Sequence, residues 1–295
     1  MKKMSPVLAL LLLAGSGGCA GQTAAAPATS AFPGAGAGPV NVVPDGYVGR
    51  FRVVATVLEN EHHGPQLCTA LAESMPPQCG GPDISGWVWD GVKHESASRT
   101  KWGAYLIIGT FDGRTFKLTE PPKVNDGSLN PEPRTPDFTS PCPAPAGGWR
   151  PVDQATTTAA ALQAAESMVT ADPDFAGLWI DQKLPPNDLA TPASDPAKLV
   201  LNVRFTKDLA LHEAQIRTVW GGALCLSGAE RSLAELAEIQ QELANEPLMT
   251  HTSTDIVTGT VEAGVIMATQ ARQRELDAMY GPGVVNLVGA LEPID

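Results

Sequence analysis

The chain has few basic residues for its length. Lysine and arginine total 20 against 32 aspartates and glutamates in 295 residues, which gives a formal net charge of −12. Proteins that bind nucleic acid or an anionic lipid surface gather basic residues into patches or stripes. The charge balance therefore argues against nucleic acid as a partner.

The chain also lacks an apolar run long enough to cross a membrane. Residues 7–14 form an unbroken apolar run of only eight residues, whereas a transmembrane helix needs about 20. Lys2 and Lys3 precede this run, and three small residues, Ser16-Gly17-Gly18, follow it. This pattern is typical of a signal peptide, which we place at residues 1–18.

A cysteine directly after small residues resembles the lipobox of bacterial lipoproteins, in which cleavage leaves the cysteine N-terminal and acylated. The resemblance implies that Cys19 carries fatty acyl chains, among them palmitate. These chains would anchor the protein to the extracytoplasmic side of the cell membrane. Ser16 stands where the lipobox usually has an aliphatic residue. An ordinary secretory signal cleaved nearby is the alternative.

Composition divides the rest of the chain into four segments. Residues 19–45 are mostly Ala, Gly, Pro, Thr and Ser with almost no charge, which predicts a flexible tether. Residues 46–122 are typical of a β domain, residues 123–150 of a proline-rich linker, and residues 151–295 of an α+β domain. The expected fold class is α+β, with a small all-β N-terminal domain and an α+β sandwich at the C-terminus.

Short apolar runs predict the strands of the β domain. They cover residues 51–58, 84–92, 102–111 and 114–119, and Asp112-Gly113 joins the last two as a hairpin. Several short strands in one small domain favour an OB-like barrel or a curled sheet.

Helical and strand patterns alternate in the C-terminal domain. Asp208 and Ser232 are expected helix N-caps, and Glu235 completes a capping box with Ser232. The predicted helices are residues 156–169, 209–220, 232–244 and 270–280. The predicted strands are residues 174–181, 199–205, 223–226, 255–257, 261–267 and 284–291. We expect the helices to cover one face of a mixed or antiparallel sheet.

Four cysteines remain besides Cys19, and an even number in an exported chain favours disulfides. Cys68 and Cys79 bracket a short loop in one domain, so we predict that they pair. Cys142 would then pair with Cys225 and clamp the proline-rich linker onto the C-terminal domain. Zinc is a poorer explanation because the chain has no CxxC spacing.

Two groups of stretches carry resemblances to known families. One group of stretches is similar to a family of secreted proteins and lipoproteins of high-GC bacteria, which implies an extracytoplasmic location. The group comprises His63-Gly64-Pro65-Gln66-Leu67-Cys68, the Pro77–Asp83 stretch and Gly86-Trp87-Val88-Trp89. Three stretches after about residue 174 resemble alpha-lytic-protease-type prodomains. They are Phe175-Ala176-Gly177-Leu178-Trp179-Ile180-Asp181, the Leu199–Val203 run and the Gly221-Gly222-Ala223 turn. Those prodomains are folding chaperones and inhibitors of their own protease.

Sequence motifs for catalysis are absent. The chain has neither GxSxG nor GDSGG for a serine nucleophile, and no GxGxxG or GxxxxGK[ST] for a nucleotide. We interpret His212, on a predicted exposed helix face, as solvated, and His251 has no stronger catalytic signal. No cofactor is expected, and a hydrolase with an unrecognised site is the weakest of three hypotheses.

One group of side chains could bind metal. Glu61, His62 and His63 follow the first predicted strand, and His94 follows the second. Imidazoles with a carboxylate are ligands for zinc or copper, provided that the chain turns so that both adjacent histidines face one site. A polar loop after an edge strand is the alternative.

Tryptophans could also form a binding face. Trp87 and Trp89 alternate on a predicted strand, and Trp102 begins the next one. Such aromatic residues can stack on sugars or anchor a protein partner. A core stripe is the alternative, because alternate strand positions usually face inward.

Together these features predict a non-enzymatic envelope lipoprotein that binds a protein partner at the cell surface. An inhibitor-like or chaperone-like contact through the C-terminal domain is the specific variant. A metal-binding or small-ligand-binding envelope protein that uses the His/Glu group is the alternative.

Overall fold

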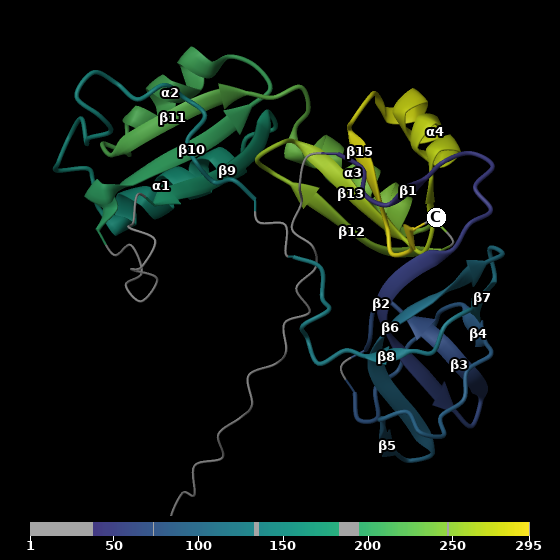
Figure 1. Cartoon of the computed structure of the whole chain (residues 1–295). Helices are drawn as coiled ribbons and strands as arrows, with labels where there is room; N and C mark the ends of the chain where they lie inside the picture. The colour runs from purple at the N-terminus through teal and green to yellow at the C-terminus, as the bar shows by residue number, and fades with distance from the viewer. Residues whose placement is uncertain (1–37, 73, 133–135, 183–194, 247, 295) are drawn as a thin grey trace, which may run out of the picture. The chain divides into compact units, whose positions relative to one another are not determined.

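A computed structural model describes residues 38–72, 74–132, 136–182, 195–246 and 248–294 (Figure 1). By its internal contacts the chain divides into Met1–Phe32 and Pro33–Asp295, and every described residue belongs to the second unit. Cys19 and the predicted signal peptide lie outside the described residues.

Two long strands form the centre of the β-rich part. Strand β2 (Phe51–Asn60) pairs antiparallel with β6 (Thr100–Phe111), from Phe51 opposite Gly109 to Glu59 opposite Lys101. Buried and more exposed residues alternate along most of β2, because successive side chains of a strand point to opposite faces. Both predicted strands are thus confirmed, as is the hairpin that leads into β7 (Thr115–Leu118).

The strand pairings of the β-rich part form a closed series that begins at β2 and returns to it through β6. Strand β2 also pairs with β3 (His63–Cys68), β3 with β4 (Asp83–Ser85), β4 with β7, and β7 with β6. The inward residues include Val57, Leu67, Tyr105, Ile107 and Phe116, all fully buried in one hydrophobic cluster. Two short strands, β5 (Glu95–Ala97) and β8 (Lys123–Val124), both pair with β6.

The predicted strand at residues 84–92 is wrong beyond Ser85. Gly86 has a φ of +83°, which is left-handed backbone and ends the extended run of β4. Residues 86–92 form a loop, in which the amide of Val92 donates to the carbonyl of Trp89 at 3.1 Å. Trp87 and Trp89 therefore do not lie on a strand.

The first half of the C-terminal domain follows the predicted order of elements. It contains α1 (Ala159–Thr170), β9 (Phe175–Gln182), β10 (Leu199–Phe205), α2 (Leu209–Arg217) and β11 (Ala223–Gly228), with a 3-10 turn at Pro196–Lys198. Strand β10 is central, antiparallel to β9 and parallel to β11. Asp208 is the N-cap of α2, but its φ is +51° and its side chain makes no capping hydrogen bond.

The second half repeats the same order. It contains α3 (Leu233–Ala244), β12 (Met249–Asp255), β13 (Thr260–Val265), α4 (Gln270–Tyr280) and β15 (Val285–Gly289). Strand β13 is central, antiparallel to β12 and parallel to β15. The predicted capping box of Ser232 and Glu235 at the start of α3 is confirmed.

The predicted C-terminal domain, residues 151–295, thus contains two α-β-β-α-β halves, each with its own three-stranded sheet. The mixed α+β class is as expected, but the helices cover two sheets instead of one. Each sheet buries one face against helices: Leu201, Val203 and Phe205 of β10 pack in one cluster with residues of α1 and α2. Val261 and Leu287 pack in another with residues of α3 and α4.

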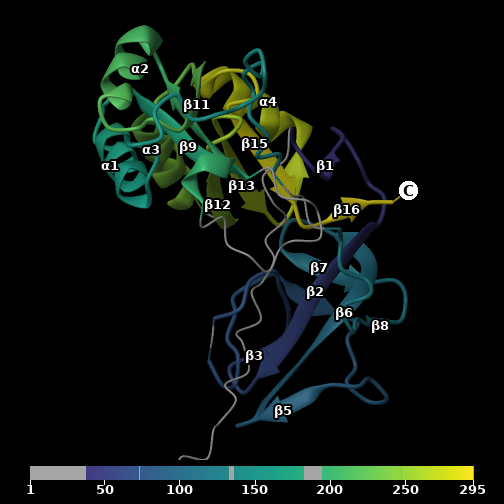
Figure 2. The ribbon, with the colours of Figure 1, turned by 90° about the vertical axis from the view of Figure 1, so that its left-hand side faces the viewer.

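The ends of the described chain join strands far away in sequence. Strand β1 (Val42–Val43) pairs parallel with β14 (Ala268–Thr269). The prediction of a flexible tether at residues 19–45 is therefore wrong for β1, because these two residues form backbone hydrogen bonds with a strand. Strand β16 (Glu292–Pro293) pairs antiparallel with the start of β2, as Figure 2 shows. The last residues of the chain therefore extend the sheet of the β-rich part.

Burial of Tyr105 is expected to make the folded protein less stable at alkaline pH. Its side chain is fully buried, its hydroxyl donates to the carbonyl of Lys93 at 2.7 Å, and burial raises its pKa to about 12. Above pH 10 the unfolded chain loses this proton before the folded chain does. We therefore expect the free energy of unfolding to fall by up to about 1.4 kcal/mol per pH unit between pH 10 and 12.

Urea denaturation at several pH values would measure this loss, with Tyr105→Phe as the comparison. The variant loses the hydrogen bond to Lys93 but has no phenol to titrate, so its stability should fall less steeply over the same interval. Equal slopes for the two proteins would contradict the assignment to Tyr105.

Candidate functional site

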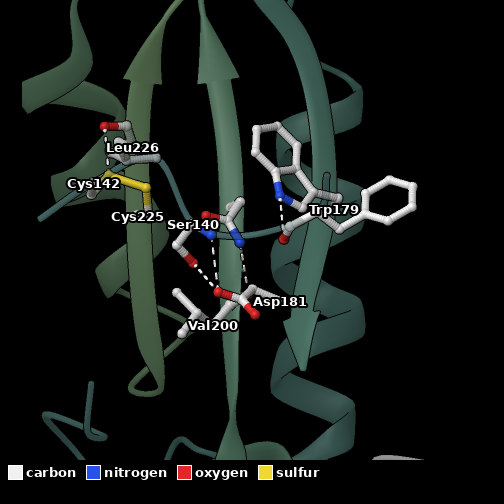
Figure 3. The surroundings of a disulfide bond; sticks show 9 residues. Ser140, Cys142, Trp179, Asp181, Val200, Cys225 and Leu226 are labelled. Atoms are coloured by element: carbon white, nitrogen blue, oxygen red, sulfur yellow. Dashed lines mark hydrogen bonds between the residues drawn. A yellow bond between two sulfur atoms is a disulfide. The ribbon is translucent and has the colours of Figure 1, made fainter. Parts of the chain in front are cut away.

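A segment of the predicted linker lies across the face of the first sheet that bears no helix. We call residues 136–149 the strap. The indole Nε1 of Trp179 donates to the carbonyl of Phe138 at 3.1 Å, and Ser140 donates to Asp181 Oδ2 from its amide at 2.9 Å and its hydroxyl at 2.8 Å. Figure 3 shows these contacts over β9 and β10.

A disulfide fixes the strap to β11. Cys142 is bonded to Cys225, and Cys142 and Trp149 pack against Val200 and Ala223 of the sheet. The second disulfide joins Cys68 and Cys79. Both predicted pairings are confirmed, and the second joins residue 142 of the predicted linker to β11.

The proposed metal ligands of the β domain have separate contacts. His63 hydrogen-bonds to Asn60 and to the carbonyl of Gly64, at 2.8 and 2.7 Å, and it begins β3 instead of ending β2. Glu61 pairs with Arg99 at 2.5 Å and lies 3.8 Å from the exposed ring of His62.

His94, the fourth of these residues, packs its ring beside Trp89. The geometry thus offers no convergence of the four side chains, and metal binding there stays a prediction.

Two of the three tryptophans of the predicted binding face lie in the core, and the third, Trp87, is partly buried against it. Trp89 and Trp102 are each only 8% exposed, and Trp87 packs against the same cluster as Trp89. The indole of Trp89 donates to Glu59 at 2.7 Å, and the rings of Trp87 and Tyr105 meet edge to face. This burial favours the core alternative over stacking on a ligand.

Two arginines line a partly open cavity of about 300 Å³, whose lining residues come from both α-β-β-α-β halves. Arg204 lies on β10, and Arg231 immediately precedes the N-cap of α3. The other lining residues come from three turns: Ala229, Glu230, Thr258, Gly259, Thr260, Pro282, Gly283 and Val284. Gly259, at a φ of +75°, leaves room for the guanidinium, since a Cβ there would lie 3.1 Å from Arg204 Nη1.

Backbone carbonyls, and not carboxylates, hold both guanidinium groups. Arg204 Nη1 donates to the carbonyl of Val257 at 2.7 Å, and Arg231 Nη2 donates to that of Tyr280 at 2.6 Å. Burial lowers the pKa of Arg204, and the charge of Asp255 opposes this shift. Within the part of the chain that the structure describes, neither arginine forms an ion pair with a carboxylate. Glu230 lines the cavity too, but it is exposed and pairs with neither arginine.

Sequence reasoning missed a second polar cluster. His212 was expected to be solvated, but it is only 5% exposed and lies near Asp172 and Asp174. The inward face of α2 differs from the face that the sequence indicates. The apolar Leu211 points outward and is 56% exposed, whereas His212 takes the inward position. The closely spaced carboxylates of Asp172-Pro173-Asp174 were the available signal.

No protein-family model matches this chain, and no curated protein matches it significantly. None of the helices in the described ranges is long and apolar enough to cross a membrane.

Proposed function

We propose that this protein is a non-enzymatic lipoprotein of the cell envelope that binds a protein partner at the cell surface. The predicted signal peptide and Cys19 support a lipid anchor, and two disulfides support an extracytoplasmic location. The proposal includes an OB-like barrel or curled sheet for the β-rich part. The closed series of pairings from β2 through β3, β4, β7 and β6 supports that form.

The cavity with Arg204 and Arg231 is the observation that carries this proposal. A guanidinium offers five donors, and carbonyls take only some of them here. A carboxylate can accept two parallel hydrogen bonds from one guanidinium, which is the strongest pairing available to arginine. The ligand chemistry that fits is therefore a carboxylate on a protein, from an acidic side chain or a C-terminus.

Arginine is among the residues that contribute most to binding at protein interfaces. The chain as a whole is acidic, with a net charge of −12, so it repels acidic proteins at long range. A specific partner must then bring its carboxylate into the cavity itself. An inhibitor-like or chaperone-like contact through the C-terminal domain would be one form of this interaction.

Affinity purification of the tagged lipoprotein from gently solubilised envelopes tests the proposal. We expect one protein to be recovered near stoichiometry with the wild type. Because loss of such an arginine typically costs about 2 kcal/mol or more, Arg231→Gln should weaken capture by about 30-fold. Arg231→Lys should restore it only in part, because an ammonium cannot make the bidentate pair.

Arg217→Gln is the matched control. Like Arg231, Arg217 donates to a backbone carbonyl, that of Gly222 at 2.6 Å, but it does not line the cavity. It should leave capture unchanged, and melting temperatures would show that all variants fold. Absence of a stoichiometric partner with the wild type, or equal capture by Arg231→Gln, would refute the proposal.

A further inference from the structure

Two corners of the first α-β-β-α-β half bring three metal-ligating side chains together. Asp172 and Asp174 lie between α1 and β9, and His212 lies in the first turns of α2. One ligand atom from each of the three can be chosen so that all lie within 4.8 Å of one another. The sequence separates His212 from the aspartates by about 40 positions, so only the fold makes this group.

His212 is a buried polar side chain with little to bond to. Its side chain is 6% exposed, and its Nδ1 lies 3.5 Å from Asp172 Oδ2, which is long for a charge-assisted hydrogen bond. Its Nε2 has no hydrogen-bond partner within the described ranges. Nδ1 is therefore the nitrogen that a metal between the carboxylates would take, and among the described residues it has only that one long contact.

Packing holds the imidazole in place. Its ring stacks on that of Phe205, with centroids 3.8 Å apart and planes 4° from parallel. Phe205 is itself fully buried at the end of β10. The ring is therefore oriented in advance towards Asp172, as a metal ligand needs to be.

The carboxylates already attract a cation. Lys207 Nζ lies 3.1 Å from Asp174 Oδ1 and forms an ion pair with it. The lysine side chain is 65% exposed, so it can leave without disturbing the core. Asp172 Oδ1 accepts the amide of Asp174 at 2.8 Å, which directs the other oxygen towards His212.

We propose that Asp172, Asp174 and His212 bind a divalent transition-metal ion, with zinc as the best fit, and that the metal displaces the ammonium of Lys207. An imidazole with two carboxylates suits zinc better than calcium or magnesium, which prefer oxygen ligands throughout. In tetrahedral geometry, ligand atoms about 2.1 Å from zinc stand about 3.4 Å apart. His212 Nδ1 and Asp172 Oδ2 already stand 3.5 Å apart, and no pair of ligand atoms exceeds 4.8 Å, so only a small movement is needed.

This site is independent of the arginine cavity and of the proposed protein partner. It also differs from the predicted group in the β domain, because Glu61, His62, His63 and His94 take no part in it. Zinc at this position would link the connection between α1 and β9 to the start of α2.

Calorimetric titration of zinc chloride into the detergent-solubilised full chain tests the site. We expect one zinc ion per chain and a higher melting temperature with zinc. Asp174→Asn should weaken binding at least 30-fold, because it removes a charged ligand on a partly exposed corner. Lys207→Gln should tighten binding about tenfold, because it removes the competing cation.

Controls separate this site from other sources of binding. Lys198→Gln removes an exposed lysine that pairs with Asp195 at 3.5 Å, with no histidine in that pair, so zinc affinity should not change. A His62→Ala, His63→Ala, His94→Ala variant should bind zinc as the wild type does. Absence of zinc binding by the wild type, or wild-type affinity in Asp174→Asn, would overturn the proposal. Loss of binding in the triple variant would do the same.

Discussion

Replacing Cys142 and Cys225 by serine is expected to lower the free energy of unfolding by about 4.5 kcal/mol. The bond closes a loop with a sequence separation of 83 residues, so its loss greatly increases the freedom of the unfolded chain. The strap would keep its hydrogen bonds to Trp179 and Asp181 and the packing of Trp149 on the sheet. Chemical denaturation under non-reducing conditions would measure the change.

The other disulfide is the matched control for this prediction. Cys68 and Cys79 are 11 residues apart, so the same entropy argument gives about 3 kcal/mol for their replacement by serine. The long-loop variant should therefore be the less stable of the two. The reverse order would mean that contacts of the strap, and not loop closure, determine its contribution.

Trp220→Ala is expected to lower the free energy of unfolding by about 4 kcal/mol. Trp220 is fully buried beyond the end of α2, and its Nε1 donates to the carbonyl of Ala223 at 3.1 Å. The indole packs so closely over Gly222 that a Cβ at that glycine would overlap it. Removing the ring leaves a cavity next to the central strand of the first sheet, which the rigid surroundings only partly fill.

Urea denaturation followed by far-ultraviolet circular dichroism would measure the loss. Leu211→Ala on α2 is the control, because Leu211 is 56% exposed and should change stability by no more than about 0.5 kcal/mol. Similar losses for the two variants would contradict the buried position of Trp220.

Local patterns predicted most elements of this chain, for reasons that the structure explains. The Ser232 capping box is a contact between residues three positions apart, so it can be identified from sequence alone. The Asp112-Gly113 turn likewise joins neighbouring strands, and Gly113 has a φ of +94°. The strand predicted at residues 84–92 failed because two apolar tryptophans suggested alternation, whereas Gly86 interrupts the extended backbone.

The polar sites were harder to predict, because they depend on residues distant in sequence. Arg204 and Arg231 belong to different halves of the C-terminal domain, and nothing in their neighbours indicates a common cavity. His62 and His63 of the β domain, by contrast, are adjacent in sequence, yet His63 begins β3 after a turn and bonds to Asn60, whereas the ring of His62 is exposed. Proximity in sequence was a poor guide to a shared site.

The sequence by itself determined the acidic charge and the four helices after residue 151, and it predicted the pairing of the four described cysteines. Short-range hydrogen bonds and cysteine parity control these features, and all can be read within a few residues or by counting. Only the tertiary structure decided that the C-terminal domain has two sheets, that β16 joins β2, and that Asp172 meets His212. These contacts form because separate apolar faces must each be buried, and that requirement acts between segments far apart in the chain.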